Sequence, residues 1–262
     1  MTFGTETAYL YRNPLKRAVV RIIGDTHYGH VLRYLYLKQT LDALKIRPRR
    51  ILDAGCGRGE LTLYLARRFP DAEIVGVDAD ARELELAKQM QRAAGIENVA
   101  FHECDLQGSL PFGQFDLILS FEVIECVPDD NAMLKNLNAA LQAKGICLIH
   151  VMHKTGAYRR VGLRRLHAPA LGDWSSTGQV RAGYTEPELS ELLRRNGFAQ
   201  VTTRLTFGAW GMWAHSVFEF ARTLPMPFYL CVYPFLVAAG HVDTHLQHAW
   251  GGSVLAIAAK TL

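Results

Sequence analysis

The residues best suited to bind a nucleoside lie at the ends of two short apolar segments. Asp53 ends the first segment, and Gly55, Gly57 and Gly59 follow it at alternate positions. Asp78 ends the second segment. Glycine tolerates a positive φ and lets a ligand approach the backbone closely. A carboxylate accepts hydrogen bonds, so Asp78 can hold both hydroxyls of a ribose. The spacing therefore predicts a nucleoside pocket.

Two nucleoside cofactors compete for this pocket, and the acidic residues around the glycines distinguish them. A dinucleotide site requires G-x-G-x-x-G, whose third glycine allows close packing of the helix. Glu60 occupies that third position here. A pyrophosphate binds an unopposed helix N-terminus, and Asp53 and Glu60 would repel it. The same acids suit a ligand that carries an ammonium and a sulfonium, so S-adenosylmethionine is favoured over NAD.

The pocket needs elements that bring these residues to one edge of a sheet. Residues 51–52 and 74–77 are apolar enough for buried strands, and residues 60–69 have the apolar spacing of a helix. Ligands of open α/β sheets bind outside the carboxyl ends of the strands, beside such a glycine loop.

Four segments together resemble the class I S-adenosylmethionine-dependent methyltransferases. Residues 51–59 look like motif I of that family, and residues 75–78 look like its ribose-binding strand end. Residues 101–106 are similar to its third strand, and residues 115–125 to its fourth strand and the following loop. One departure is Cys126, where many members of the family carry a histidine that could act as a base.

The resemblance implies a set of cofactor-binding residues. The terminal acid of the third strand would bind the adenine amino group, and this role maps to Asp105. The whole set comprises Asp53, Ala54, Gly55, Cys56, Gly57, Asp78, Ala79, Asp105, Leu106, Phe121 and Glu122.

The fold expected is α/β, with a Rossmann-like, seven-stranded, mostly parallel sheet. Residues 1–46 are predicted as an N-terminal helical cap, and residues 47–262 as the methyltransferase core. Thr185 and Glu188 form a capping box at the start of a late helix. The core carries additions at 153–183 and 208–252, the second a helical insert between the last two strands. Function is grafted onto such additions, so we expect them to build the substrate chamber.

The insert has two interpretations. Residues 223–242 contain no Asp, Glu, Lys or Arg. A stretch of this length is about long enough to span a bilayer. A single span is excluded because both flanking segments belong to one sheet. Pro225, Pro227 and Pro234 are also expected to interrupt a regular helix. The insert is therefore either a buried cap over the active site or an interfacial patch that contacts lipid.

Three side chains are candidates for catalysis. His153 follows the fifth strand, where it could meet a substrate hydroxyl as a general base, and His27 or Tyr28 could face the methyl group. Structural roles are the alternative for each of them. His241, His245 and His248 would share one face of a helix, but no cysteine or carboxylate accompanies them at a recognised spacing. No metal is assigned.

Composition limits the partners. The formal net charge of +4 does not by itself indicate nucleic acid, and none is expected. An odd number of cysteines, five, fits reduced thiols better than a disulfide framework, and residues 1–13 lack a signal-peptide core. A cytoplasmic location is expected, with a peripheral position on the inner face of a membrane under the lipid-contact interpretation.

The function expected is methyl transfer from S-adenosylmethionine to a hydrophobic small-molecule or lipid-like acceptor. An Asn-Pro-Pro-Tyr motif, typical of amine methylation, is replaced after the fourth strand by Ser120-Phe121-Glu122-Val123. This favours an oxygen or carbon acceptor. The alternative is a membrane-surface or lipid-binding protein that keeps the fold without the activity; a nicotinamide oxidoreductase is disfavoured by Glu60.

Overall fold

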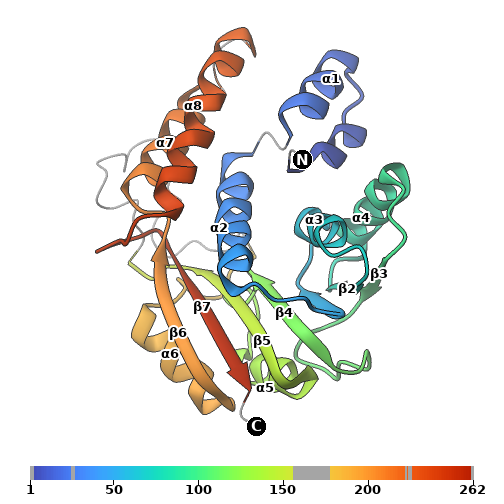
Figure 1. Cartoon of the computed structure of the whole chain (residues 1–262), viewed down its shortest axis with the longest axis vertical. Coiled ribbons are helices and arrows are strands. Elements are labelled where there is room, and N and C mark those ends of the chain that lie inside the picture. The colour runs from blue at the N-terminus through green and yellow to red at the C-terminus, as the bar shows by residue number, and fades with distance from the viewer. Residues whose placement is uncertain (1–2, 25–26, 156–177, 222, 224–225, 261–262) are drawn as a thin grey trace.

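The structure is a computed structural model that describes residues 3–24, 27–155, 178–221, 223 and 226–260 (Figure 1). Its centre is a seven-stranded sheet in the order β3-β2-β1-β4-β5-β7-β6. The strands are β1 (Arg50–Ala54), β2 (Glu73–Asp78), β3 (Val99–Glu103), β4 (Phe115–Phe121), β5 (Leu141–Met152), β6 (Phe198–Thr206) and β7 (Ser253–Lys260). This confirms the α/β, Rossmann-like fold with seven strands.

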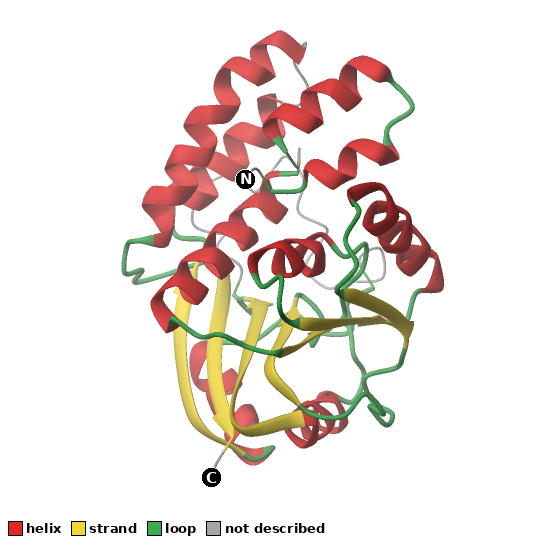
Figure 2. Ribbon diagram, turned by 45° about the vertical axis from the view of Figure 1, so that its right-hand side comes forward, coloured by secondary structure: helices red, strands yellow, loops and turns green. Residues whose placement is uncertain are grey.

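Helices lie on both faces of the sheet and extend beyond one end of it (Figure 2). They are the 3-10 helix η1 (Thr5–Leu10) and the α-helices α1 (Pro14–Ile23), α2 (Tyr28–Leu44), α3 (Glu60–Arg68), α4 (Ala81–Ala94), α5 (Asp130–Ala140), α6 (Glu186–Arg195), α7 (Ala209–Ala221) and α8 (Met226–Thr244).

The parallel half of the sheet brings the predicted pocket residues to one edge. β1 pairs in parallel with β2 and β4, so that Asp53 lies opposite Gly76 and Leu119. The carboxyl ends of β1, β2 and β4 therefore meet at the same edge, where ligands of such sheets bind. β7 runs antiparallel to both β5 and β6, which makes the sheet mostly parallel, as predicted.

Three apolar clusters hold the molecule together. One packs α5 and α6 against β4, β5 and β7, and a second packs α3 and α4 with the C-terminal half of α2 against the other face. The third joins the N-terminal half of α2 to α7 and α8, with Tyr28, Leu32 and Leu236 fully buried. α2 therefore packs against the sheet with its C-terminal half and against the insert with its N-terminal half.

Local capping signals in the sequence are confirmed. Thr185 accepts from the backbone N–H of Glu188, and the Glu188 carboxylate accepts from the backbone N–H of Thr185, so the capping box is complete. The structure also shows a cap at α5, where Asp129 accepts from the N–H of Ala132. These signals depend on neighbouring residues only, which is why they can be predicted without the fold.

The expectation that prolines interrupt the insert is wrong for Pro234. α8 continues through this residue over 19 residues. Pro234 lies on the exposed side, whereas Tyr233 and Leu236 bury the other side against α2 and α7, and this packing offsets the lost hydrogen bond. Pro227 occupies the first turn, where no N–H is needed, and Pro225 lies outside the described residues.

Within the described ranges, no helix is long and apolar enough to cross a membrane. The insert contains two helices, α7 and α8, and the start of α7 and the end of α8 lie near the sheet (Figure 1). Most of the other predicted addition, residues 156–177 of the segment 153–183, lies outside the described residues.

Candidate active site

The glycine loop between β1 and α3 requires its glycines for two different reasons. Gly55 and Gly59 have φ of 83° and 77°. A Cβ atom at Gly55 would lie 2.3 Å from Cγ2 of Val123, and one at Gly59 would lie 2.7 Å from Cζ of Phe101. Gly57 instead has no heavy atom within 4 Å of the position of a Cβ. The backbone at Gly57 is therefore open to a ligand, as the sequence predicts.

Asp78 links the tip of β2 to this loop. Its Oδ2 accepts from the backbone N–H of Gly57 at 2.7 Å, and its Oδ1 accepts from that of Asp80 at 2.9 Å. A carboxylate offers about four acceptor positions, so about two remain. These remaining positions are available to ribose hydroxyls beside the open backbone of Gly57. Ala79, the next residue, is exposed at the same rim.

Asp53 lies beneath the loop and does not line its surface. The side chain is 3% exposed and accepts a hydrogen bond of 2.6 Å from the hydroxyl of Thr62 on α3. Burial raises the pKa of Asp53 to about 7, although the bond from Thr62 opposes this rise. Ala54 and Cys56 are buried as well. Asp53 can therefore act on a bound cation through its charge, but its side chain is not exposed to contact the ligand directly.

Asp105 lies two residues beyond the end of β3. Its Oδ1 accepts from the backbone N–H of Gln107 at 2.9 Å, and hydrogen bonds from this backbone and from the Gln107 side chain lower the pKa of Asp105. The side chain is exposed, whereas Leu106 is buried. Gln107 in turn accepts from the N–H of Asp129, which ties this rim to the start of α5.

A carboxylate and an imidazole meet at the ends of β4 and β5. Nδ1 of the fully buried His150 lies 2.7 Å from Oε1 of Glu122, and Nε2 lies 3.0 Å from the hydroxyl of Thr206. The His150 ring is held between Phe121 and Phe207, with centroid distances of 5.2 and 5.3 Å. An ionised carboxylate only accepts, so Nδ1 carries a proton and donates it to the hydrogen bond with Glu122.

Glu122 has three features of a functional side chain. Its φ is 60°, a strained value that persists mainly where the surroundings enforce it. Its side chain remains 20% exposed although its partner is buried. Burial on its own raises the pKa of Glu122, but the hydrogen bond with His150 and the charge of Arg33 outweigh this and hold the pKa below its usual value. Glu122 is therefore a carboxylate at neutral pH.

The position of Glu122 is between the glycine loop and the helical cap. The next residue, Val123, packs directly on Gly55. From the other side, α2 brings Arg33 and His30 close enough for their charges to act on Glu122. A ligand bound at the glycine loop would therefore lie close to this carboxylate.

A second carboxyl group, Glu125, has the opposite character. It is fully buried, its Oε1 accepts from the N–H of Met152 at 3.4 Å, and its Oε2 has no hydrogen-bond partner. Burial and the charge of Glu122 raise the pKa of Glu125 to about 8. Glu125 is therefore mostly a neutral acid at pH 7. Cys126, at the position where relatives carry histidine, is half-buried and next to it, and burial raises the thiol pKa to about 11.

The three side chains predicted as catalytic are not brought together. The ring of His153 follows β5, and its Nδ1 lies 2.9 Å from the hydroxyl of Thr155. His27 is exposed at the start of α2, with its ring 4.5 Å from that of His30. Tyr28 is fully buried, and its hydroxyl donates to the carbonyl oxygen of Leu236 at 2.7 Å. The site places Glu122 and His150, rather than Tyr28, beside the glycine loop.

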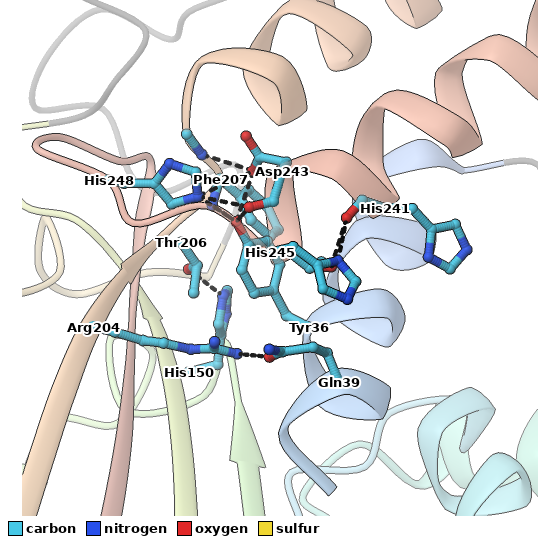
Figure 3. Close-up of polar contacts among 12 residues, drawn as sticks. Tyr36, Gln39, His150, Arg204, Thr206, Phe207, His241, Asp243, His245 and His248 are labelled. Carbon is cyan, nitrogen blue, oxygen red and sulfur yellow. Dashed lines mark hydrogen bonds and ion pairs between the residues drawn. The ribbon is translucent and has the colours of Figure 1, made fainter. Parts of the chain in front are cut away.

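The three histidines of the insert do not share a helix face, because α8 ends at Thr244, before two of them (Figure 3). His241 is exposed, and Nδ1 of His245 lies 2.8 Å from the His241 carbonyl oxygen. His248 folds back into the interior. Within the described residues, no three potential ligands are grouped as a metal would need.

His248 instead belongs to a buried polar cluster at the base of the insert (Figure 3). The hydroxyl of Tyr36 donates to Oδ2 of Asp243 at 2.7 Å and lies 2.9 Å from Nε2 of His248. It also accepts from the N–H of Phe207, while Oδ2 of Asp243 accepts from the N–H of Gly208. These contacts fix α2, the start of α7 and the end of α8 to one another.

Glu122 and His150 were missed as a pair from the sequence. The sequence predicts Glu122 as a cofactor-binding residue and His153 as the candidate base. One signal was available: Glu122 and His150 lie at the carboxyl ends of adjacent strands, β4 and β5, where Phe121 pairs with His150.

The donor set fits S-adenosylmethionine. Gly57 offers open backbone, Asp78 retains acceptor positions for a ribose, and Glu122, together with the partly ionised Asp53, supplies negative charge for an ammonium and a sulfonium. A pyrophosphate would meet repulsion from the same two acids.

Known proteins agree with this site. Residues 48–179, half of the chain, match the model of a family described as a methyltransferase domain. The trans-aconitate 2-methyltransferase of Methylobacterium radiotolerans is 30% identical over 138 residues, which is 51% of each chain. The ubiquinone biosynthesis O-methyltransferase of Azorhizobium caulinodans is 31% identical over 147 residues, 55% of this chain and 53% of that protein. The chain spans about half the length of these curated relatives.

The fold has counterparts among solved structures as well. The plantazolicin methyltransferase BpumL, in complex with a pentazolic desmethylPZN analog and SAH, has a TM-score of 0.59 over 98% of this chain and 95% of that chain, at 16% identity. This likeness concerns the fold. Together with the family model over half of the chain and the glycine loop followed by Asp78, it shows that the chain belongs to the class I S-adenosylmethionine-dependent methyltransferases.

Proposed function

We propose that this chain transfers a methyl group to an oxygen or carbon atom of a small apolar acceptor held between the glycine loop and the helical cap. Bound S-adenosylmethionine would supply an electrophilic methyl group on its sulfonium. Among the predicted cofactor residues, Gly57 and Asp78 would bind the nucleoside, and Asp105 would contact the adenine at the rim. One relative is named as an O-methyltransferase, which agrees with an oxygen acceptor.

The observation that carries the proposal is the position and charge of Glu122. It lies between Val123, which packs on the glycine loop, and Arg33 of the cap, and it is held as a carboxylate. An oxygen or carbon acceptor must lose a proton, and a side chain that receives it accelerates the reaction by about 10²–10⁴-fold. Amines need no such group once they are uncharged.

The proton transfer can be written atom by atom. The O–H bond of the acceptor breaks, its electron pair stays on the acceptor oxygen, and the proton forms a new bond to a carboxylate oxygen of Glu122. His150 does not lose its proton in this step, because its Nδ1–H continues to donate to Glu122. Its buried position between two aromatic rings makes it a positioning residue, whereas Glu122 is the proposed catalytic residue.

The carboxylate need not be a strong base. The acidity of the acceptor oxygen rises as its bond to the methyl carbon forms, so a group of low pKa can accept the proton late in the step. The cap contributes by excluding water and by orienting the acceptor. His153 stays a second candidate for the base, and the comparison of two variants distinguishes it from Glu122.

The acceptor is proposed to be hydrophobic because the helices next to the candidate site, α2, α7 and α8, pack through aromatic and aliphatic side chains. The third apolar cluster contains the aromatic residues Phe3, Tyr28, Tyr36, Phe207, Phe218, Tyr229 and Tyr233. A lipid-like acceptor would also explain why the insert exposes apolar side chains. We include in the same proposal that the protein lies peripherally on the inner face of a membrane.

The test compares Glu122→Gln with His153→Gln in transfer of labelled methyl groups from S-adenosylmethionine to fractions of a cell extract. Gln at position 122 keeps the shape and can still accept from His150, but it cannot receive the proton. We expect turnover to fall by about 10²–10⁴-fold in Glu122→Gln and by less than about tenfold in His153→Gln. The reverse order would assign the proton to His153. Equal turnover in both variants and the wild type would favour an amine acceptor.

A further inference from the structure

Exposed apolar side chains are concentrated at one end of the molecule. Eleven large hydrophobic side chains are exposed in the described part of the chain, and nine of these lie on η1, α1, α7 and α8. We call these four elements the helical end. In both views, α1 and the α7–α8 pair lie at the end of the molecule away from the C-terminus (Figures 1 and 2). Monomeric soluble proteins rarely gather exposed apolar groups in this way.

α7 and α8 present a largely apolar outer surface, on which Glu219 of α7 is partly exposed. α8 exposes Phe228, Phe235 and Val242, spaced at seven residues, so that they follow one face of the helix. α7 exposes Trp213 and Phe220 at the same spacing, with Trp210 three residues before Trp213. Residues 223–242 contain no charged side chain. This pattern is what an interfacial segment needs, and it includes tryptophan, which favours the membrane–water boundary.

Phe220 lies in the last turn of α7 and Phe228 in the first turn of α8, and their side chains are 63% and 62% exposed. α7 begins directly after β6 and α8 ends shortly before β7, so these two residues lie far from the sheet. A helix of 19 residues is about 28 Å long. The end of α7 at Phe220 and the start of α8 at Phe228 therefore project well beyond the core, where these side chains can enter a lipid surface without moving the sheet.

α1 supplies positive charge that can attract an anionic lipid surface. The helix contains Lys16, Arg17 and Arg21 and no acidic residue, and Arg12 precedes it. It also exposes two large aliphatic side chains, Leu15 at 59% and Ile22 at 75%. A cationic helix that exposes leucine and isoleucine fits the boundary of an anionic bilayer, where it gains both charge attraction and apolar burial.

A second copy of the chain is a poorer occupant of this surface. If two helical ends packed about a twofold axis, the cations of residues 12–21 would lie near their own counterparts. Apart from the buried Asp243, the acidic residues of the helical end are Glu6 and Glu219, fewer than the four cations of residues 12–21, so a second copy would neutralise that charge only in part. Anionic headgroups would neutralise it without such a constraint.

The helical end is also connected to the candidate active site. Tyr28 of α2 donates to the carbonyl oxygen of Leu236 on the inner face of α8, and Gly240 of α8 allows close approach to the same hydroxyl. One turn further along α2, the charge of Arg33 acts on Glu122. α2 therefore contacts α8 through Tyr28 and acts on the proposed catalytic carboxylate through Arg33.

We propose that the helical end docks on an anionic lipid bilayer, from which the apolar acceptor enters the site under the cap. The route of the acceptor rests on the proposed function, whereas docking does not require turnover. The chemistry recognised is a layer of acyl chains bounded by phosphate headgroups. α1 contributes the cations, and the α7–α8 pair contributes the aromatic side chains that insert.

Docking is tested by sedimentation of the whole chain with vesicles. The vesicles contain phosphatidylcholine alone or with about one-third phosphatidylglycerol, at about 0.05 M and 0.5 M NaCl. We expect sedimentation with the anionic vesicles at low salt and much less with the neutral vesicles or at high salt. No sedimentation with anionic vesicles at low salt would overturn the proposal.

Two double variants and a matched control separate charge from insertion. Lys16→Gln with Arg21→Gln removes two cations and should weaken binding to anionic vesicles about thirtyfold. Phe228→Ser with Phe235→Ser should weaken it at least about tenfold. The control, Val180→Ser, removes an exposed apolar side chain outside the helical end and should bind like the wild type. Binding of either double variant at the wild-type level would contradict the assignment of this surface.

The same samples distinguish the remaining outcomes. The alternative outcome in analytical ultracentrifugation is a dimer of the wild type that the double variant Phe228→Ser with Phe235→Ser abolishes. If the wild type also fails to bind vesicles, this result would assign the surface to a second copy and overturn docking. Binding of S-adenosylhomocysteine, measured by calorimetry on each variant, checks that the fold is intact. Vesicle binding without methyl transfer to any extract fraction would refute the proposed function and leave docking supported.

Discussion

Replacement of Asp78 by Ala tests how the glycine loop holds the cofactor. In the structure, the Asp78 carboxylate accepts from the N–H groups of Gly57 and Asp80, and its remaining acceptor positions would hold the ribose. Hydrogen bonds to a charged group contribute about 1.5–3 kcal/mol each and act partly together. The variant should therefore bind S-adenosylhomocysteine about 2–4 kcal/mol more weakly, which is about 30- to 900-fold in the dissociation constant.

The variant also loses two hydrogen bonds within the protein. Because Asp78 is only half-buried, solvent replaces part of their contribution, and we expect the free energy of unfolding to fall by about 1–2 kcal/mol. Urea denaturation without ligand measures this loss separately from binding. Titration calorimetry with S-adenosylhomocysteine then measures the dissociation constant of the folded variant.

Asp80→Ala is the matched control. Asp80 caps α4 by accepting from the N–H of Arg82, so its loss should lower the free energy of unfolding by about 1 kcal/mol. Its carboxylate is not directed at the loop, and binding should change by less than about threefold. An unchanged dissociation constant in Asp78→Ala would place the ribose elsewhere. An equal loss of binding in Asp80→Ala would mean that general disturbance of the β2–α4 turn is the cause.

Three further predictions concern the charged and buried groups around the site. Glu122→Gln should bind S-adenosylhomocysteine within about tenfold of the wild type while turnover falls, so an equal loss of both would assign Glu122 to the cofactor alone. The pKa of Glu125 is raised to about 8 from an ordinary value of 4.5. Between these two pH values the folded state binds more protons than the unfolded state, so the free energy of unfolding falls as the pH rises through this range. Glu125→Gln should reduce this loss in urea denaturation between pH 5 and pH 8, and an unchanged slope would show that Glu125 ionises normally. Tyr36→Phe removes a donor to the buried Asp243 and should lower the free energy of unfolding by about 2–3 kcal/mol without changing cofactor binding. Tyr34→Phe on the same helix serves as its control, and equal effects in the two variants would refute the role of the Tyr36 hydroxyl.

The parts predicted from the sequence are those that contiguous residues determine. The glycine loop and the capping box at Thr185 depend on local backbone chemistry, and the strands on runs of apolar residues. The position of Asp78 also followed, because parallel strands end at one edge of a sheet.

The parts that were missed depend on residues far apart in the chain. His150 meets Glu122 across 28 positions, and His248 meets Tyr36 across 212. The spacing of His241, His245 and His248 predicted one helix face, but α8 ends at Thr244, where Asp243 is buried against Tyr36. Pro234 was expected to interrupt a helix that tertiary packing maintains. Local rules cannot supply these contacts, since only the folded chain brings the partners together.

The central claim, methyl transfer from S-adenosylmethionine to an apolar acceptor, is tested most directly by mass balance. The wild-type chain and Asp78→Ala are incubated with methyl-labelled S-adenosylmethionine and a fractionated cell extract, and label and S-adenosylhomocysteine are both quantified. We predict that label enters an organic-soluble fraction in a one-to-one ratio with S-adenosylhomocysteine, and that Asp78→Ala at subsaturating cofactor loses most of this transfer. Binding of S-adenosylhomocysteine by the wild type, without label in any fraction, would contradict the account.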